Sequence, residues 1–248
     1  MFDFLFKKKT AELPELFFHT DIHCHIMPGV DHGSPDVETS LKLIESEQSW
    51  GINRIVLTSH VTESTFENTP ETLAAGFERL TAAVKEAGND IKLAYSAEYR
   101  IDSLFSEQYA AGKLIKMPGD FLLVENSFIQ EPWGLDNLLF DLKINGYKTI
   151  MAHPERFPYY YEDKKRYDKL HSAGNYFQVN LLSLSGYHGG DAKKIAEWLV
   201  NKGYADFLGT DIHHHSHVEA IDKYLRSKEF KKLMPMLEKT VKNDELPF

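Results

Sequence analysis

The sequence predicts an α/β fold in which repeated strand–helix units close into a barrel. Seven short apolar runs without strict alternation predict strands covered on both faces, as in a parallel sheet. The runs begin 27 to 37 residues apart, which leaves room for one strand, one helix and two loops. Seven such units favour a closed or nearly closed barrel over two separate domains. The predicted strands are residues 17–21, 54–58, 91–97, 121–124, 149–152, 176–179 and 205–209.

Helical patterns fill the spaces between the predicted strands. Apolar residues recur on one helical face within residues 37–44, 73–84, 135–142 and 192–199. Ser34-Pro35-Asp36 and Thr69-Pro70-Glu71 each combine an N-cap, a proline for the first helical position and an acid near the positive helix end. A glycine precedes each later strand by a few residues, where a helix C-cap needs a left-handed residue. These glycines are Gly51, Gly88, Gly112, Gly146, Gly174 and Gly203.

No linker or compositional break divides the chain, so we expect one barrel domain over residues 17–248. Residues 1–16 are interpreted as an N-terminal extension that is expected to be disordered. The last stretch, residues 218–242, is predicted to be a helix that covers the barrel.

Composition and charge exclude several classes of protein. A formal net charge of −9 would repel a polyanion, so nucleic acid is not an expected partner. The single cysteine, Cys24, excludes an internal disulfide framework and favours the cytoplasm. The sequence has neither a signal peptide nor an apolar stretch long enough to predict a membrane span.

Imidazoles and carboxylates follow six of the seven predicted strands. In an α/β barrel the C-terminal strand ends share one rim, where such groups would be costly without a cation. The spacings His23-Cys24-His25 and Asp211-Ile212-His213 are typical of chelating pairs, because residues i and i+2 of a strand point to the same side. We therefore predict a metal cluster at this rim. The candidate residues are His23, His25, His60, Glu98, Glu125, His153, Asp211 and His213, with Asn180 at the remaining strand end.

The loop after the first strand offers two further candidates, Asp31 and His32, either of which could reach the cluster; His32 is the chosen ligand. His214, His215 and His217 are expected to be exposed or to lie behind the ligands. His19, His171 and His188 are expected to be structural or surface groups.

Cys24 is not expected to be a nucleophile. A cysteine-dependent phosphatase loop needs an arginine six positions after the cysteine to hold phosphate, and this chain has Val30 there. Cys24 is therefore interpreted as a small spacer between His23 and His25.

Mixed imidazole and carboxylate donors suit Mn, Fe or Zn, and the absence of thiolate ligands argues against a closed structural zinc site. About eight ligands exceed the needs of one ion. We therefore expect two or three ions, with Glu98 as a bridging carboxylate, that lower the pKa of a shared water to give the nucleophile.

Seven motifs in order resemble the polymerase and histidinol phosphatase (PHP) superfamily, specifically its bacterial tyrosine-protein phosphatases of capsule and exopolysaccharide systems. The likeness runs from about residue 21 to residue 213 and implies a distorted seven-stranded (βα)7 TIM-like barrel with manganese ions. The motifs are Asp21-Ile22-His23-Cys24-His25, Thr58-Ser59-His60, Ala97-Glu98-Tyr99, Val124-Glu125-Asn126, Gln130-Glu131-Pro132-Trp133, His153-Pro154-Glu155-Arg156 and Thr210-Asp211-Ile212-His213.

The resemblance implies three sets of ligands. One ion falls to His23, His25, Glu98 and Asp211, a second to Glu98, Glu125 and His153, and a third to His32, His60 and His213. His32 departs from the tyrosine phosphatase branch, which usually has aspartate there, and this leaves the identity of the third ion open.

The resemblance also implies two catalytic residues and a substrate. Arg156 matches the arginine that contacts substrate phosphate, and a guanidinium fork suits two phosphoryl oxygens. Asp211 is placed to assist the reaction. The implied substrate is a phosphotyrosine tail on a bacterial tyrosine kinase that controls polysaccharide export, which could hold the enzyme at the periphery of the inner membrane.

Three alternatives remain open at this point. A small-molecule phosphatase, such as one for histidinol phosphate, would keep the site but need a closed polar pocket. A metal-dependent amidohydrolase commonly bridges its metals with a carboxylated lysine after a middle strand. This chain has Glu98 and Glu125 at those positions, which counts against this alternative. A metal-storing or scaffold protein is disfavoured by Arg156.

Overall fold

The computed structural model describes residues 15–248. Most of the predicted N-terminal extension, residues 1–14, lies outside this range. Leu16 is buried, and its backbone N–H donates to the carbonyl of Trp50 at 2.8 Å. Leu16, which belongs to the predicted extension, therefore packs against the core.

All neighbouring strands of the two sheets run parallel. One sheet has the order β1-β2-β4, and the other has the order β3-β5-β6-β7-β8-β9. The strands are β1 (Thr20–Cys24), β2 (Arg54–Leu57), β3 (His60–Val61), β4 (Lys92–Tyr95), β5 (Glu98–Arg100), β6 (Phe121–Glu125), β7 (Lys148–Ala152), β8 (Tyr176–Asn180) and β9 (Phe207–Gly209).

Two of the predicted strands are broken, so the described chain has nine strand segments where seven runs were predicted. The second run divides into β2 and β3, and the third into β4 and β5. At the first break the Thr58 hydroxyl contacts the backbone N–H of Cys24 at 3.1 Å. At the second, the Ser96 hydroxyl donates to the carbonyl of Ile115 at 2.6 Å. Each of these two chain segments therefore leaves one sheet and joins the other.

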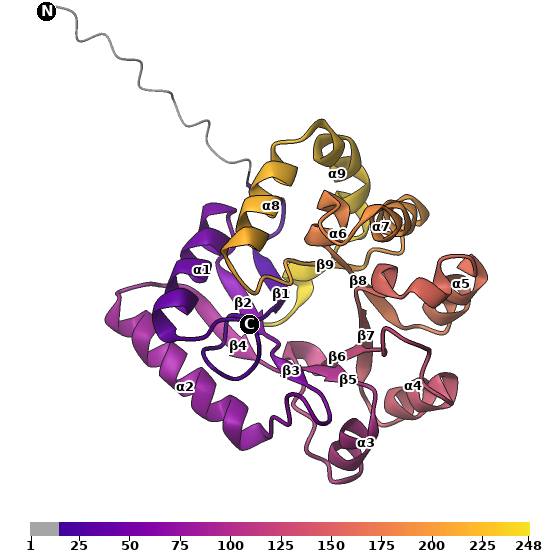
Figure 1. Ribbon diagram of the computed structural model, residues 1–248, viewed down its shortest axis with the longest axis horizontal. Coiled ribbons are helices and arrows are strands. Elements are labelled where there is room, and N and C mark those ends of the chain that lie inside the picture. The colour runs from indigo at the N-terminus through magenta and orange to yellow at the C-terminus, as the bar shows by residue number, and fades with distance from the viewer. Residues whose placement is uncertain (1–14) are drawn as a thin grey trace, which may run out of the picture.

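Two backbone hydrogen bonds link the first strand to the chain after the last strand. The Asp211 N–H donates to the His23 carbonyl at 2.8 Å, and the His25 N–H donates to the Ile212 carbonyl at 2.9 Å. The sheets consequently curl toward each other, with the longer helices around the outside (Figure 1). This curl places the beginning and the end of the domain beside each other.

Helices alternate with the strands as predicted. Thr69 caps α2 with Pro70 at its first position, whereas α1 is capped by Asp36 and not by Ser34. All six glycines predicted to end helices adopt a positive φ, between 65° and 90°. The helices are α1 (Val37–Ser49), α2 (Pro70–Glu86), α3 (Ser103–Ala110), α4 (Leu135–Ile144), α5 (Lys164–Ser172), α6 (Leu181–Ser185), α7 (Gly190–Lys202), α8 (His215–Leu225) and α9 (Lys228–Thr240), with short 3-10 turns at Pro118–Asp120, Pro154–Arg156, Pro158–Tyr160 and Asn243–Glu245.

Two predicted element bounds are wrong. The first strand is Thr20–Cys24, because the apolar side chains of residues 16–18 pack beside the sheet before the strand begins. The single helix predicted for residues 218–242 is two helices, since Ser227 starts α9 by accepting the N–H of Phe230 at 3.0 Å.

Buried apolar residues fill both faces of the strands. The larger cluster lies largely between strands and helices, and a smaller one joins Ile22, Val56, Leu123, Ile150 and Phe207 from five strands. This packing on both faces explains why the strand sequences do not alternate. In residues 15–248, no helix combines the length and the hydropathy needed to span a bilayer.

Candidate metal centre

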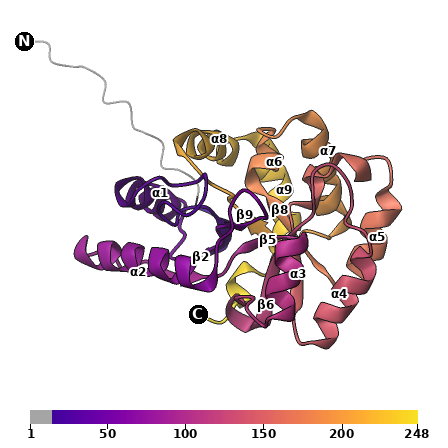
Figure 2. The same ribbon diagram turned by 60° about the horizontal axis from the view of Figure 1, so that its bottom comes forward.

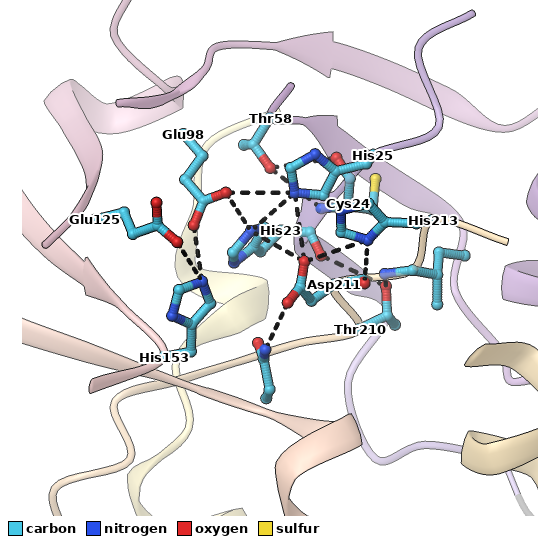
Figure 3. A network of polar contacts seen from close by, with 12 residues as sticks. His23, Cys24, His25, Thr58, Glu98, Glu125, His153, Thr210, Asp211 and His213 are labelled. Carbon is cyan, nitrogen blue, oxygen red and sulfur yellow. Dashed lines mark hydrogen bonds and ion pairs between the residues drawn. The ribbon is translucent and has the colours of Figure 1, made fainter. Parts of the chain in front are cut away.

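Glu98 lies at the centre of a buried cluster of predicted ligands (Figure 3). Its Oε2 is 2.9 Å from His60 Nδ1 and 3.4 Å from the Nε2 atoms of both His23 and His25. Its Oε1 is 2.8 Å from His153 Nε2. Burial alone would raise the pKa of Glu98, but His23 and His60 hold it well below its usual value. One carboxylate thus faces four imidazoles, which is the position predicted for a bridging ligand.

His23, His25 and Asp211 form one group of potential ligands, with ligand atoms within 4.8 Å of one another. Asp211 Oδ1 lies 3.6 Å from His23 Nε2 and 3.3 Å from His25 Nε2. Burial would lower the pKa of His23, but the carboxylates of Glu98 and Asp211 raise it to about 9. The two ends of the domain therefore supply one concentrated set of donors.

The second predicted set is divided between two groups of potential ligands that share Glu98. His153 Nε2 lies 3.5 Å from Glu125 Oε1 and faces Glu98 on its other side. His153, Glu98 and His23 form one compact group, and Glu98, Glu125 and His60 form another. The carboxylate of Glu98 is common to both groups.

The third predicted set is only partly assembled. His60 and His213 lie in one group, but their third member is His25 and not His32. His32 is exposed, and its ring stacks on those of His213 and His60 at centroid distances of 4.5 and 4.9 Å. The structure thus places His32 against the cluster without putting it in any of the four groups.

Side chains behind the cluster fix which ring nitrogens face it. His23 Nδ1 lies 2.7 Å from Gln178 Oε1, so its Nε2 is directed at the cluster. Gln178 donates to Asn180 Oδ1 at 2.6 Å, and Asn180 in turn donates to Asp211 Oδ2 at 2.7 Å. Strand β8 therefore supplies two amides that orient His23 and Asp211. Partners of this kind are typical of metal sites.

Asp31 performs the same role for His25. Its Oδ2 lies 2.9 Å from His25 Nδ1 and accepts the backbone N–H of His60 at 3.0 Å. Burial would raise the pKa of Asp31, but His25 holds it well below its usual value, so the carboxylate is ionised. Of the two loop candidates, Asp31 orients a potential ligand and His32 borders the pocket.

Replacing Asp31 with alanine is expected to weaken metal binding about ten- to a hundredfold, since His25 would lose the acceptor that orients its ring. Calorimetric titration of metal into the chelated protein measures this change. Glu38→Ala, at an exposed position of α1, is the matched control and should bind as the wild type does. Unchanged affinity in the Asp31 variant would contradict the orienting role.

Two of the clustered residues have a strained backbone. His153 has φ 31° and Asp211 has φ 51°, in the left-handed region that residues other than glycine rarely adopt. Such strain costs on the order of 1 kcal/mol or more and is common where side chains must be aimed at a site. The surrounding hydrogen bonds, including that from the Asp211 N–H to His23, hold these two conformations.

Several buried nitrogen and oxygen atoms in the cluster make no hydrogen bond with the described residues. They are His213 Nε2, His153 Nδ1 and Glu98 Oε2, whose contact with His60 Nδ1 at 2.9 Å is an ion pair without a hydrogen bond. Unpartnered buried polar atoms are costly, and a cation would satisfy those that face the cluster. The donors are imidazole nitrogens and carboxylate oxygens, which fit Mn, Fe or Zn. The cluster therefore fits bound metal.

A pocket of about 360 Å³ opens above the cluster. Arg156 enters it from the turn after β7, donates to Asp211 Oδ2 at 3.0 Å and keeps a quarter of its side chain exposed. Arg156, which was predicted to bind phosphate, thus lies in the pocket beside a candidate ligand. Its guanidinium carbon lies 4.9 Å from the ring centroid of Phe128.

Sequence reasoning missed several residues that line this pocket. Arg100 donates to Glu125 Oε2 at 3.0 Å and also faces Phe128. Phe66 also lines the pocket and stacks on the ring of His60. His188, expected to be structural, lines the pocket, and burial lowers its pKa to about 3. Only Arg100, two residues after Glu98 along the same strand, carried a signal that could have been found.

The remaining histidines divide between pocket and surface. His214 and His217 line the pocket, with their rings 3.9 Å apart, whereas His215 is exposed. His19 pairs with Asp244, and His171 pairs with Asp206. His19 is exposed and His171 is half-buried, so both agree with the predicted structural or surface roles.

Cys24 is fully buried, and burial raises the pKa of its thiol well above its usual value. A neutral, enclosed thiol is a poor nucleophile. Its side chain packs in the larger apolar cluster, which agrees with the predicted role as a spacer.

Comparison with known proteins gives relatives along most of the chain. Residues 19–243 match the family described as capsular polysaccharide synthesis, CpsB/CapC. The chain is 27% identical over 224 residues to the tyrosine-protein phosphatase YwqE of Bacillus subtilis, covering 88% of this chain and 87% of that protein. It is 30% identical over 206 residues to the tyrosine-protein phosphatase CpsB of Streptococcus pneumoniae, covering 78% and 82%.

A solved structure agrees with these relatives. The fold superposes with a TM-score of 0.80 and 25% identity on a structure from a study of YwqE and CpsB, described there as unique metal-dependent tyrosine phosphatases. The superposition covers 92% of this chain and 93% of the other. This chain therefore belongs to the CpsB/CapC family of capsular polysaccharide synthesis proteins.

Proposed function

We propose that this protein is a metal-dependent phosphatase that removes phosphate from tyrosine side chains of proteins. The observation that carries the proposal is a pocket with aromatic walls and an arginine directly above the buried ligand cluster. Both Phe66 and Phe128 line this pocket, where Phe66 stacks on His60 at 5.7 Å and Phe128 stacks on His153 at 5.9 Å. Two aromatic walls suit a phenyl phosphate better than an aliphatic one. The named relatives support the same activity.

The residues that would hold metal are His23, His25, His60, Glu98, Glu125, His153, Asp211 and His213, with His32 as the least supported ligand. We infer two or three ions, with manganese as the expected metal and Fe or Zn compatible with the same donors. When bound, these ions would lower the pKa of a water that attacks phosphorus and would neutralise charge on the phosphoryl oxygens.

Arg156 and Asp211 have separate roles in the proposed reaction. The Arg156 guanidinium binds Asp211 through one N–H, which leaves other donors of its fork for the phosphoryl oxygens. Burial would raise the pKa of Asp211, but His23 and its neighbours keep it well below its usual value. Asp211 is therefore ionised, and its carboxylate can assist the reaction by accepting hydrogen bonds from Arg156 and from a water beside the phosphate. The tyrosine hydroxyl has a pKa of about 10, so the tyrosinate can leave with little help from a general acid.

The proposed fold is a distorted seven-stranded (βα)7 barrel of the PHP type, with a single domain over residues 17–248. The support is that seven chain segments contribute the nine strands and that the first and last segments are hydrogen-bonded to each other. In such a barrel the cluster would occupy the C-terminal rim, where functional groups of α/β barrels lie.

The proposed substrate is a phosphotyrosine tail of a bacterial tyrosine kinase that regulates polysaccharide synthesis or export. The family description and the relatives' names support this assignment. The enzyme would then act in the cytoplasm, at the periphery of the inner membrane where its kinase substrate resides.

Turnover of a phosphotyrosine peptide, compared with histidinol phosphate, tests the proposal. We expect the peptide to be preferred at least about tenfold in kcat/KM, because the aromatic walls can pack on a phenyl ring. Preference for histidinol phosphate would support the small-molecule alternative instead. An amidohydrolase is disfavoured because, within residues 15–248, the pocket lining contains no lysine that could be carboxylated.

Replacing Cys24 with serine is expected to change kcat/KM less than about threefold, since the buried thiol takes no part in the reaction. Initial rates on the phosphotyrosine peptide, with and without a thiol-alkylating reagent, measure this. Loss of activity that follows thiol modification while metal content stays constant would contradict the mechanism.

A further inference from the structure

The loop of residues 126–134, between β6 and α4, carries two large apolar side chains in water beside the pocket; we refer to it as the rim loop. Ile129 is 87% exposed and Trp133 is fully exposed. Phe128, next to Ile129, lines the pocket above the cluster. The rim loop therefore runs continuously from the pocket wall to an apolar outer surface.

The rim loop is anchored by a polar network. Arg166 of α5 donates from Nε and Nη2 to the carboxylate of Glu131 at 2.7 and 2.8 Å, and the Tyr160 hydroxyl donates to the same group. Tyr159 donates to the carbonyl of Ser127 at 2.8 Å. The loop thus turns its charged residue inward and its apolar residues outward. Helices α4 and α5 lie side by side beneath it (Figure 2).

The rim loop turns its charged residue inward and exposes large apolar side chains to water. This pattern is typical of a binding surface. Exposed tryptophan side chains on fixed backbone are typical binding hot spots, because they bury much area and little ordering entropy is lost on binding. A partner that covered Trp133 would gain this area without reorganising the loop.

The charge around the rim loop indicates the kind of partner. The chain as a whole has a net charge of −9, and the cations Arg166 and Lys169 of α5 beside the loop are paired with Glu131 and Asp136. Two copies of so acidic a chain repel each other, whereas the phosphate of a phosphotyrosine peptide is attracted to the arginines of the adjoining pocket. The pocket next to the loop is itself lined by Arg100 and Arg156.

We propose that the rim loop binds the polypeptide that flanks the phosphotyrosine, with Ile129 and Trp133 packing on an apolar or aromatic side chain of the substrate segment. This inference rests on the proposed phosphatase function, because the tyrosine phosphate would occupy the adjoining pocket. The rim loop then determines which phosphotyrosine proteins are good substrates, while the cluster and Arg156 act on the phosphate.

The test compares Trp133→Ala with the wild type on two substrates, a phosphotyrosine peptide with apolar flanking residues and free phosphotyrosine. We expect kcat/KM on the peptide to fall at least about tenfold and kcat/KM on free phosphotyrosine to stay within about twofold. Ile129→Ala should show the same pattern with a smaller loss. Phe140→Ala is the matched control, since Phe140 is also largely exposed but lies on α4 outside the pocket lining.

Other outcomes separate the inference from the function on which it rests. If the wild type turns over neither substrate, both the phosphatase assignment and the inference about the rim loop fail. If the wild type is active but Trp133→Ala loses nothing, or loses equally on both substrates, only the inference fails. A concentration-dependent dimer that Trp133→Ala dissociates, measured by light scattering, would assign the surface to a second copy and overturn the proposal.

Discussion

Replacing Glu98 with alanine is expected to lower kcat/KM on phosphotyrosine peptides by about 10³-fold or more and to reduce the bound metal. Glu98 faces His23, His25, His60 and His153, which is more imidazoles than any other carboxylate of the described cluster faces. Its loss would remove a bridge between ions and leave clustered imidazoles without their carboxylate. A 10³-fold loss corresponds to about 4 kcal/mol of transition-state stabilisation.

Elemental analysis of the purified variants, with initial rates, measures this effect. Glu98→Gln keeps the shape of the side chain and covers the case in which the alanine variant does not fold. His32→Ala is the matched control, since His32 is exposed and lies in none of the compact ligand groups. Chelation of the wild type should abolish activity, and added Mn should restore it. Equal metal loss in the Glu98 and His32 variants would contradict the central role of Glu98.

The parts of the site that the sequence predicted share one physical cause. Parallel strands place their C-terminal ends at one edge, so His60, Glu98, Glu125 and His153 could be grouped from their positions along the chain. Asp211 could be placed beside His23 because a closing barrel joins its first and last strands, and the backbone hydrogen bond between them agrees.

The strand breaks could not be predicted, because they depend on contacts between distant segments. Thr58 contacts the backbone of Cys24, and Ser96 donates to Ile115; neither contact leaves a local pattern. The first strand was misplaced for a related reason. His23 is buried in a polar site, so the true strand has fewer apolar residues than the segment before it.

The residues of the pocket walls could not be predicted from the sequence either. Phe66, Phe128 and His188 stand alone in connecting segments, where a single aromatic residue gives no periodic signal. Gln178 orients His23 from within a buried strand, but an amide in such a run indicates nothing about its partner until the fold is known. Residues that position ligands are thus harder to predict than the ligands themselves.

Replacing Arg156 with alanine is expected to lower kcat/KM by about 10²-fold while metal content survives, because a guanidinium binds phosphate but cannot coordinate a cation. Asp211 would keep its hydrogen bond from Asn180 at 2.7 Å, so the cluster should stay assembled. Arg226→Ala, at an exposed position of the α8 end, is the control for loss of one positive charge and should leave kcat/KM unchanged.

The variant Arg156→Lys distinguishes the shape of the guanidinium from its charge. The lysine ammonium would still be drawn to Asp211, but a point charge cannot contact two phosphoryl oxygens in one plane, so Arg156→Lys should remain well below the wild type. Inhibition by inorganic phosphate should weaken in both variants, since this measures binding of the anion directly. Near-normal kcat/KM in Arg156→Ala, with metals and fold intact, would show that Arg156 only pairs with Asp211, and phosphate would then have to be held by another group such as Arg100.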